Sequence, residues 1–323
     1  MLNDYCSIAW VSLLMITYPT VPNHEVFGQP CLVAKRCNCL VAAAGLGDEE
    51  RLLGGAVQRK PVQDIPENLF WVSDVQINEL YPPFRKHLKS CGIILAATDK
   101  VPNQFLNRVG KVIEEIFTHR DGIDLEAQRD VVEALHAYGA LLPVPRNEGS
   151  FDRLIQRDEQ AFDRLHRKYS ICDIIMAQVP EGQVMEVVEH ILHTVTDVGL
   201  HYQFPNEWGL SRNSELWSAM QRAIDEGFYD VSSYHDLDGA PQEVVDRILM
   251  QEFAYWFITT AWDLQEMYGP EEDEWTLRTP EELKSKMPEF YGIYLRTAAR
   301  VMSPPSPQSL TQIGPKRKAE RRR

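Results

Sequence analysis

The stretch that most constrains this chain runs from Gln183 to His201 and reads QVMEVVEHILHTVTDVGLH. Its aliphatic side chains recur at helical spacing and make one apolar face: Val184, Val187, Val188, Ile191, Leu192, Val195 and Val198. The other face carries Glu186, Glu189, His190, His193 and Asp197. The pattern predicts an amphipathic helix that Gly199 ends.

Two polar residues of this helix have the spacing of a metal-binding pair. Glu189 and His193 are four residues apart, so their side chains lie one helical turn above each other and can point at the same atom. A helix can hold a metal ion with two side chains in this way. The alternative is a helix whose solvated face carries two histidines with no ligand.

A third candidate ligand lies further along the chain. Glu252 stands in LMQEFAYWF, within a predicted helix at 241–267 that is apolar nearly all round and is therefore expected to be buried. A lone buried carboxylate is costly unless it is paired, protonated or bound to a metal. Glu252 could instead lie on a wet edge or pair with an arginine such as Arg247.

Together, Glu189, His193 and Glu252 offer two carboxylates and one imidazole. Three protein ligands with an open position are the pattern of catalytic zinc, which activates water and polarises carbonyl groups. His190 lies beside these ligands and is the candidate general base. His201, eight residues after His193, is a weaker candidate for a ligand.

These residues carry a resemblance to a known family. Glu189-His190-Ile191-Leu192-His193 resembles the His-Glu-x-x-His helix of zincin metallopeptidases with its first two residues exchanged. Glu252 resembles the downstream glutamate that gluzincins use as a third ligand. The region from Phe84 to Thr279 is similar to a group of uncharacterised proteins with degenerate zincin-like helices, often Glu-Glu-x-Leu-His.

The resemblance implies a zincin-like core and a zinc-dependent, peptidase-type hydrolase that acts on a peptide or protein. Zinc would be held by Glu189, His193 and Glu252, with His190 as the catalytic base. The exchanged first two positions and the long gap from His193 to Glu252 depart from the zincin pattern. A second reading is therefore a zincin-shaped protein that has lost its metal and serves as a binding or structural module.

The order of predicted elements indicates an α+β fold, with a small sheet followed by a mostly helical half. Buried strands are expected at 91–98, 140–144 and 171–179, with a further strand at 69–77. We expect one domain over 62–301, a poorly ordered segment at 1–61, and a disordered Pro/Ser-rich and basic tail at 302–323.

Charge narrows the classes of partner. The net charge is −14, and the last nine residues hold six of the 33 basic and one of the 47 acidic residues, so the remaining body carries −19. Such an acidic body argues against nucleic-acid binding through the folded domain, although the basic tail alone would suit a nuclear-import signal. The apolar run Ile8–Ile16 is too short to span a membrane. Six scattered cysteines favour a cytoplasmic protein, with a secreted or nuclear location left open.

Overall fold

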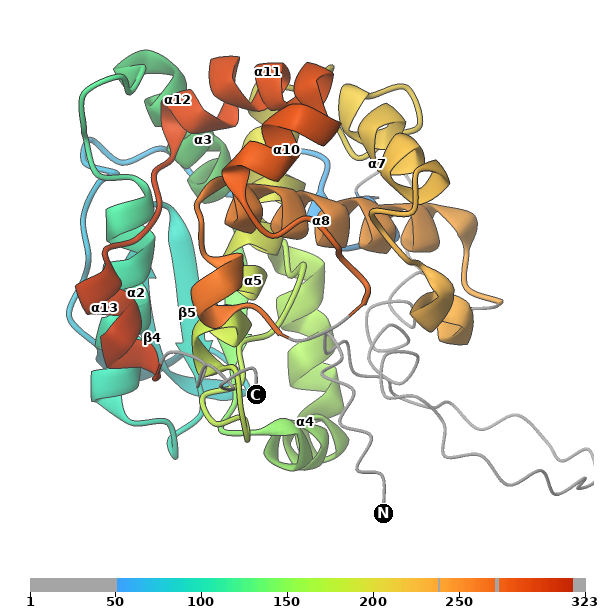
Figure 1. Ribbon diagram of the computed structural model, residues 1–323. Coiled ribbons are helices and arrows are strands. Elements are labelled where there is room, and N and C mark those ends of the chain that lie inside the picture. Colours follow the sequence, from blue (N-terminus) through green and yellow to red (C-terminus); the bar gives the residue numbers. More distant parts are fainter. Residues whose placement is uncertain (1–50, 238, 271–272, 316–323) are drawn as a thin grey trace, which may run out of the picture.

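The fold is that of a computed structural model, which describes residues 51–237, 239–270 and 273–315 (Figure 1). The strands are β1 (Arg51–Leu52), β2 (Val57–Gln58), β3 (Gln76–Tyr81), β4 (Phe84–Ser90), β5 (Ile93–Ala97) and β6 (Leu141–Val144). The helices of the first half are α2 (Asn103–Ile116), α3 (Leu125–Ala137) and α4 (Glu148–Lys168). Those of the second half are α5 (Gln183–Thr194), the π-helix η2 (Val195–Leu200), α6 (His201–Gln203), α7 (Glu215–Asp225), the 3₁₀-helix η3 (Ser232–Leu237), α8 (Gln242–Ala261), α9 (Gln265–Tyr268), α10 (Pro280–Lys286), α11 (Pro288–Arg296), α12 (Ala298–Val301) and α13 (Pro307–Ile313).

The larger sheet has the strand order β3-β4-β5-β6. β3, β4 and β5 are antiparallel neighbours, whereas β5 and β6 are parallel. Because parallel neighbours need a long crossover, α2 and α3 stand between β5 and β6 in the sequence. β5 and β6 are buried along their whole length, which is why both appear as apolar runs in the sequence.

The strand expected at 171–179 is not formed. This segment is extended and mostly buried, and it runs beside β6 through hydrogen bonds from Ile175 N–H to Pro143 and from Ala177 N–H to Pro145. Prolines have no N–H to return, so a regular ladder cannot form along this edge. The strand expected at 69–77 is also displaced, because only a bridge from Val72 to Ser90 precedes β3.

The site helices are held between the sheet and the helical half of the chain. α2 packs on β4 and β5, α5 contacts β6, and α8 crosses α5 (Figure 1). α8 is buried from Met250 to Thr260, as its nearly all-round apolar sequence predicts. The long helix expected at 241–267 ends at Ala261, and α9 follows after a break at 262–264.

Gly199 does not end the central helix. The chain continues from α5 through η2 and α6 to Gln203 without leaving helical conformation. A Cβ at Gly199 would lie 2.9 Å from Val131 Cγ1, so the missing side chain lets α3 approach η2 closely. The glycine serves helix packing here rather than helix termination.

The N-terminal boundary expected at Val62 is too late. β1 and β2 form a hairpin from Arg51 to Gln58, and Val57 is fully buried in it. The Arg51 guanidinium donates hydrogen bonds to the carbonyls of Arg167 and Tyr169, which ties the hairpin to the end of α4. The expectation for residues 1–50 lies outside the described residues.

The tail expected to be disordered from residue 302 is partly wrong. α13 packs against α2 and α5, and it buries Leu310 and Ile313. The Glu115 carboxylate accepts hydrogen bonds from Ser306 N–H (2.7 Å) and Ser309 Oγ (2.8 Å). The prolines stop a longer helix, but apolar burial and this carboxylate order the segment through Pro315. The basic residues 316–323 lie outside the described residues.

The observed class is therefore α+β, with a small sheet and a mostly helical second half, as the element order predicts. Within the described part of the chain, no helix has the length and apolar character needed to cross a membrane.

Candidate metal centre

The three predicted ligands meet in the structure. Glu189 and His193 come from α5 and Glu252 from α8, where the two helices cross. One ligand atom from each lies within 4.8 Å of the other two. His193 Nε2 is 3.4 Å from Glu252 Oε2. The expected convergence of these side chains is confirmed, and what they bind stays a prediction.

The cluster is buried and its inward atoms lack hydrogen bonds. His193 is 0% and Glu252 1% exposed, while Glu189 is partly exposed. Glu189 Oε1, His193 Nε2 and Glu252 Oε2 have no hydrogen-bond partner among the described residues. Buried polar atoms are normally satisfied, so three unsatisfied ones at one point need an explanation. Two carboxylate oxygens and an imidazole nitrogen fit zinc as a donor set.

Asp173 is a site residue that the sequence analysis missed. It lies in the extended segment beside β6, and its Oδ2 is 2.6 Å from His193 Nδ1. A carboxylate can only accept, so Nδ1 carries the hydrogen. In the neutral ring the lone pair is then on Nε2, the atom that faces the two glutamates. A carboxylate behind a histidine orients metal ligands in the same manner.

One signal could have pointed to Asp173. It is the only charged residue in the apolar run ICDIIMAQV, and the reasoning that singled out Glu252 applies to it equally. Asp173 Oδ1 accepts the hydrogen bond of Ile174 N–H at 2.8 Å. The carboxylate is therefore fixed by its own backbone as well as by His193.

His190 does not occupy the position of a general base. Its Nδ1 lies 2.9 Å from Asp173 Oδ2 and its Nε2 lies 3.3 Å from Glu186 Oε1, so both nitrogens face carboxylates. Burial lowers the pKa of His190, but the charges of Asp173 and Glu186 outweigh this and raise the pKa well above its ordinary value. A protonated, enclosed imidazole cannot accept a proton, so the expectation of a catalytic base at His190 is corrected.

Asp173, His190 and His193 form a second group whose ligand atoms lie within 4.8 Å of one another. Its separations of 2.6 Å and 2.9 Å are those of ring N–H groups meeting a carboxylate. Glu186 extends this side, because its Oε1 accepts the hydrogen bond of Met176 N–H at 2.6 Å. We therefore assign protons, and not an ion, to the Asp173 side of the cluster.

The charges of the cluster shift its ionisation strongly. Burial raises the pKa of Glu189 well above its ordinary value, with Glu252 adding to the effect and the histidines opposing it. Burial lowers the pKa of His193, but Glu252 and Asp173 reverse this and raise it to about 10. In the metal-free protein a proton on His193 thus offsets part of the negative charge.

The alternative pairing of Glu252 with Arg247 is not what the contacts favour. Arg247 Nη1 donates to Gln251 Oε1 at 2.6 Å and lies 3.3 Å from Asp197 Oδ2. Burial raises the pKa of Asp197 to about 6, although the Arg247 charge opposes it. Gln251 Nε2 in turn lies 3.3 Å from His193 Nδ1. Arg247 therefore supports the cluster from behind, through Gln251.

His201 lies apart from the centre. Its Nδ1 accepts a hydrogen bond from Leu210 N–H at 3.1 Å, which leaves it out of both metal-ligand groups. The whole polar face that was expected to be solvated, from Glu186 to Asp197, is instead covered by α8 and the segment beside β6. Only Glu189 retains partial exposure on this face.

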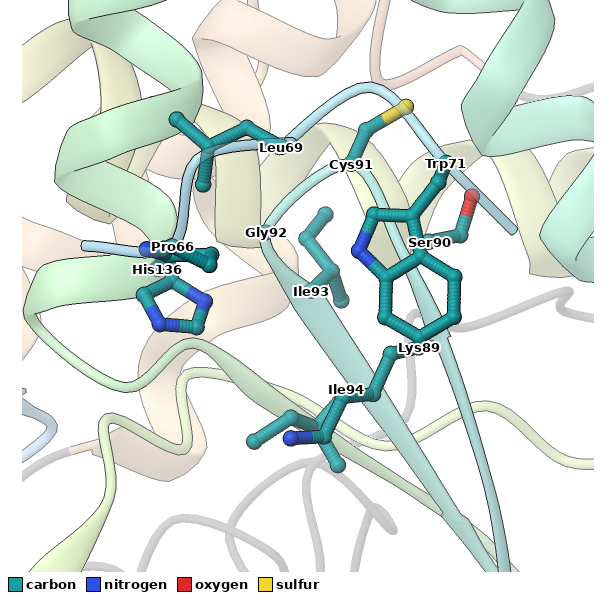
Figure 2. Close-up of a pocket in the computed structure, with 10 residues that line it drawn as sticks. All are labelled: Pro66, Leu69, Trp71, Lys89, Ser90, Cys91, Gly92, Ile93, Ile94 and His136. Atoms are coloured by element: carbon teal, nitrogen blue, oxygen red, sulfur yellow. The ribbon is translucent and has the colours of Figure 1, made fainter. Parts of the chain in front are cut away.

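A separate cavity of about 120 Å³ lies at the turn between β4 and β5. Figure 2 shows Trp71, Lys89 and His136 around it, and none of its ten lining residues belongs to the cluster. This cavity therefore adds nothing to the metal centre.

Comparison with known proteins leaves the site as the basis for function. No protein-family model, curated protein or solved structure matches this chain.

Proposed function

We propose that this protein binds a divalent metal ion, zinc in the first instance, through Glu189, His193 and Glu252, and that it is a zincin-like, metal-dependent hydrolase with a degenerate motif. The observation that carries the proposal is the convergence of three buried, unpartnered donor atoms on one point. Bound zinc would act as a Lewis acid that polarises a carbonyl and activates water.

The charge of the cluster supports a bound cation. Five carboxylates gather here with two histidines and one guanidinium: Asp173, Glu186, Glu189, Asp197, Glu252, His190, His193 and Arg247. With every group ionised, two negative charges exceed the positive ones within this set. Buried charges are costly when uncompensated, and a divalent cation would balance them.

The protein's own residues supply the orientation that a metal ligand needs. Asp173 holds His193 in the ring form whose Nε2 faces the glutamates. Glu189 is the partly exposed member of the three, so solvent or a substrate would reach the site at its side. With three protein ligands, a fourth position would stay free for the substrate.

A second function is favoured by a different observation. His190, at the position of the zincin glutamate base, is enclosed by two carboxylates and cannot take up a proton. This favours a zincin-shaped binding or structural protein in which the ion stabilises the crossing of α5 and α8. Both functions share the ion, and they differ in whether water at the ion is used for chemistry.

Metal analysis of the purified protein tests the proposal directly. We expect close to one zinc per chain after dialysis against zinc, and loss of zinc retention in Glu189→Gln, His193→Gln and Glu252→Gln. An exposed glutamate on the same helix, Glu243, provides the matched control Glu243→Gln. Retention of zinc by all three variants would refute the site. Hydrolysis of a fluorogenic peptide library by the zinc-loaded protein then separates the hydrolase from the binding protein.

A further inference from the structure

A second buried carboxylate stands next to the metal centre. Glu274 follows α9, and its backbone is fixed by a short antiparallel pairing with the segment before η3. Glu274 C=O accepts a hydrogen bond from Asp230 N–H at 2.8 Å, and Tyr229 bridges Trp275. The side chain is partly exposed. It is thus held rigidly at a place that solvent reaches.

Two donors orient this carboxylate. Tyr234 O–H donates to Glu274 Oε1 at 2.7 Å, and Trp256 Nε1–H donates to the same oxygen at 2.9 Å. Because both of these bonds fall on Oε1, Oε2 keeps lone pairs for a further donor. An oriented carboxylate with a free oxygen at the rim of a site is suited to proton transfer.

The position of Trp256 relates Glu274 to the cluster. Trp256 follows Glu252 by four residues on α8, so the two side chains lie on one face about 5–6 Å apart. The Tyr255 ring packs against Trp256 at 4.7 Å and against the His193 ring at 5.9 Å between ring centroids. Glu274 therefore lies one helical turn from Glu252, a separation that one water molecule can bridge.

We propose that Glu274, oriented by Tyr234 and Trp256, is the acid–base residue of the Glu189–His193–Glu252 site. This rests on the proposed hydrolase function, and it fills the role that His190 cannot perform. The groups that face Glu274 are Tyr234 from η3, Trp256 and Glu252 from α8, and Asp230 from the paired segment.

The proton transfers balance for hydrolysis of an amide by water. The ionised Glu274 carboxylate takes a proton from water as the water oxygen bonds to the acyl carbon. The acyl–nitrogen bond then breaks, and Glu274 returns the proton to the departing nitrogen. The products are a carboxylic acid and an amine, and Glu274 is again ionised.

The ionisation of Glu274 suits this role. Burial, and next the negative charge of Glu252, raise its pKa to about 7, while the Tyr234 and Trp256 hydrogen bonds oppose the rise. A group with a pKa near neutral pH can both accept and donate a proton there. A cation bound between Glu252 and Glu189 would offset the charge of Glu252, so zinc should lower the pKa of Glu274.

The test uses the full chain, three variants and two readouts. Glu274→Gln keeps a side-chain oxygen that can accept both hydrogen bonds, Tyr234→Phe removes one donor, and Glu243→Gln is the exposed control. The first readout is hydrolysis of the peptide library by zinc-loaded protein. The second is the pH titration of tryptophan fluorescence, taken as the difference between wild type and Glu274→Gln, because Trp256 is bonded to the titrating carboxylate.

We expect Glu274→Gln to retain zinc and to lose about a hundredfold or more of the hydrolysis rate, with Glu243→Gln unchanged. Tyr234→Phe should shift the pH profile of hydrolysis rather than abolish the rate. The fluorescence midpoint should lie near 7 without zinc and fall when zinc is added.

Zinc binding with an unmoved midpoint, or with full hydrolysis by Glu274→Gln, would overturn the assignment of Glu274 and leave the metal site intact. A protein that binds zinc and shows the shifted midpoint, yet cleaves no peptide, would support the placement of Glu274 while the hydrolase proposal fails. A protein that binds no zinc at all would remove both proposals through the metal analysis alone.

Discussion

The two ring nitrogens of His193 face two different polar environments on one helix. On the Nδ1 side, Asp173, His190 and Glu186 meet one another at 2.6–3.3 Å, with alternating charge. On the Nε2 side, Glu189 and Glu252 bring two like charges together, and the inward atoms have no hydrogen bond from the described residues. The first side is a satisfied network that specifies structure, whereas the second is a binding site without its cation.

His166 shows that an unpartnered buried atom alone does not make a site. Both of its ring nitrogens lack hydrogen-bond partners among the described residues, and it is as buried as His190. Burial, with nearby arginines adding to it, lowers the pKa of His166 to about 3, the opposite of the shift at His190. What distinguishes the Nε2 side is the convergence of several donors, and not burial.

The largest effect is expected from breaking the satisfied side. Asp173→Asn should lower the free energy of unfolding of the metal-free protein by about 3–5 kcal/mol, because it removes the carboxylate shared by two buried imidazoles. Urea denaturation at pH 7 measures this, with the exposed Asp225→Asn as control. A loss no larger than that of the control would mean that the network carries no stability.

The same variant should change the response to acid. Burial raises the pKa of Asp173, but the two histidines outweigh this and hold it below its ordinary value of 3.8. A folded pKa below the unfolded one contributes stability above pH 3.8, and that contribution is lost as the pH falls. Asp173→Asn should therefore show a shallower decline in stability below pH 4 than the wild type.

The next effect separates the two histidines of α5. His193→Gln should abolish zinc retention, whereas His190→Gln should keep zinc and lower the free energy of unfolding by about 2–3 kcal/mol, through lost contacts to charged groups. Metal analysis and urea denaturation of both variants give the comparison. The reverse pattern, with zinc lost only in His190→Gln, would place the ion on the Asp173 side.

A smaller effect, of opposite sign, is expected at Glu189. Its pKa is raised mainly by burial, so the folded metal-free protein should lose stability as the pH rises above the ordinary value of 4.5. Glu189→Gln should remove this loss and be more stable than the wild type in EDTA at pH 7, yet less stable in excess zinc. Thermal unfolding from pH 5 to 8 checks both signs. Destabilisation in EDTA would mean that Glu189 is a structural partner.

The smallest effect at pH 7 is expected at His166. With a folded pKa of about 3 against an ordinary 6.5, this residue keeps its stability contribution above pH 6.5 and loses it as the pH falls toward 3. His166→Phe should differ from the wild type by less than about 1 kcal/mol at pH 7 and should unfold less readily at pH 4. An unchanged acid limb in His166→Phe would show that other groups control it.

Local sequence patterns were enough for part of this molecule. The apolar stripe of α5 predicts the helix, the i, i+4 spacing of Glu189 and His193 predicts their common direction, and a carboxylate in the apolar α8 predicts a buried partner for Glu252. Each of these conclusions depends on residues within a few turns of one another, and helical geometry is the same in every fold.

Tertiary structure decided what covers the polar face of α5. Asp173 reaches His193 only because the prolines of β6 hold its segment extended beside the sheet without a regular ladder. Asp173 and Glu186 then enclose His190, which spacing alone suggested as a base. A helical period reports which face is apolar, but it carries no information about the segment that packs on the other face. That choice is made by contacts between residues distant in the sequence, and it separates the satisfied side of His193 from the side that we propose binds an ion.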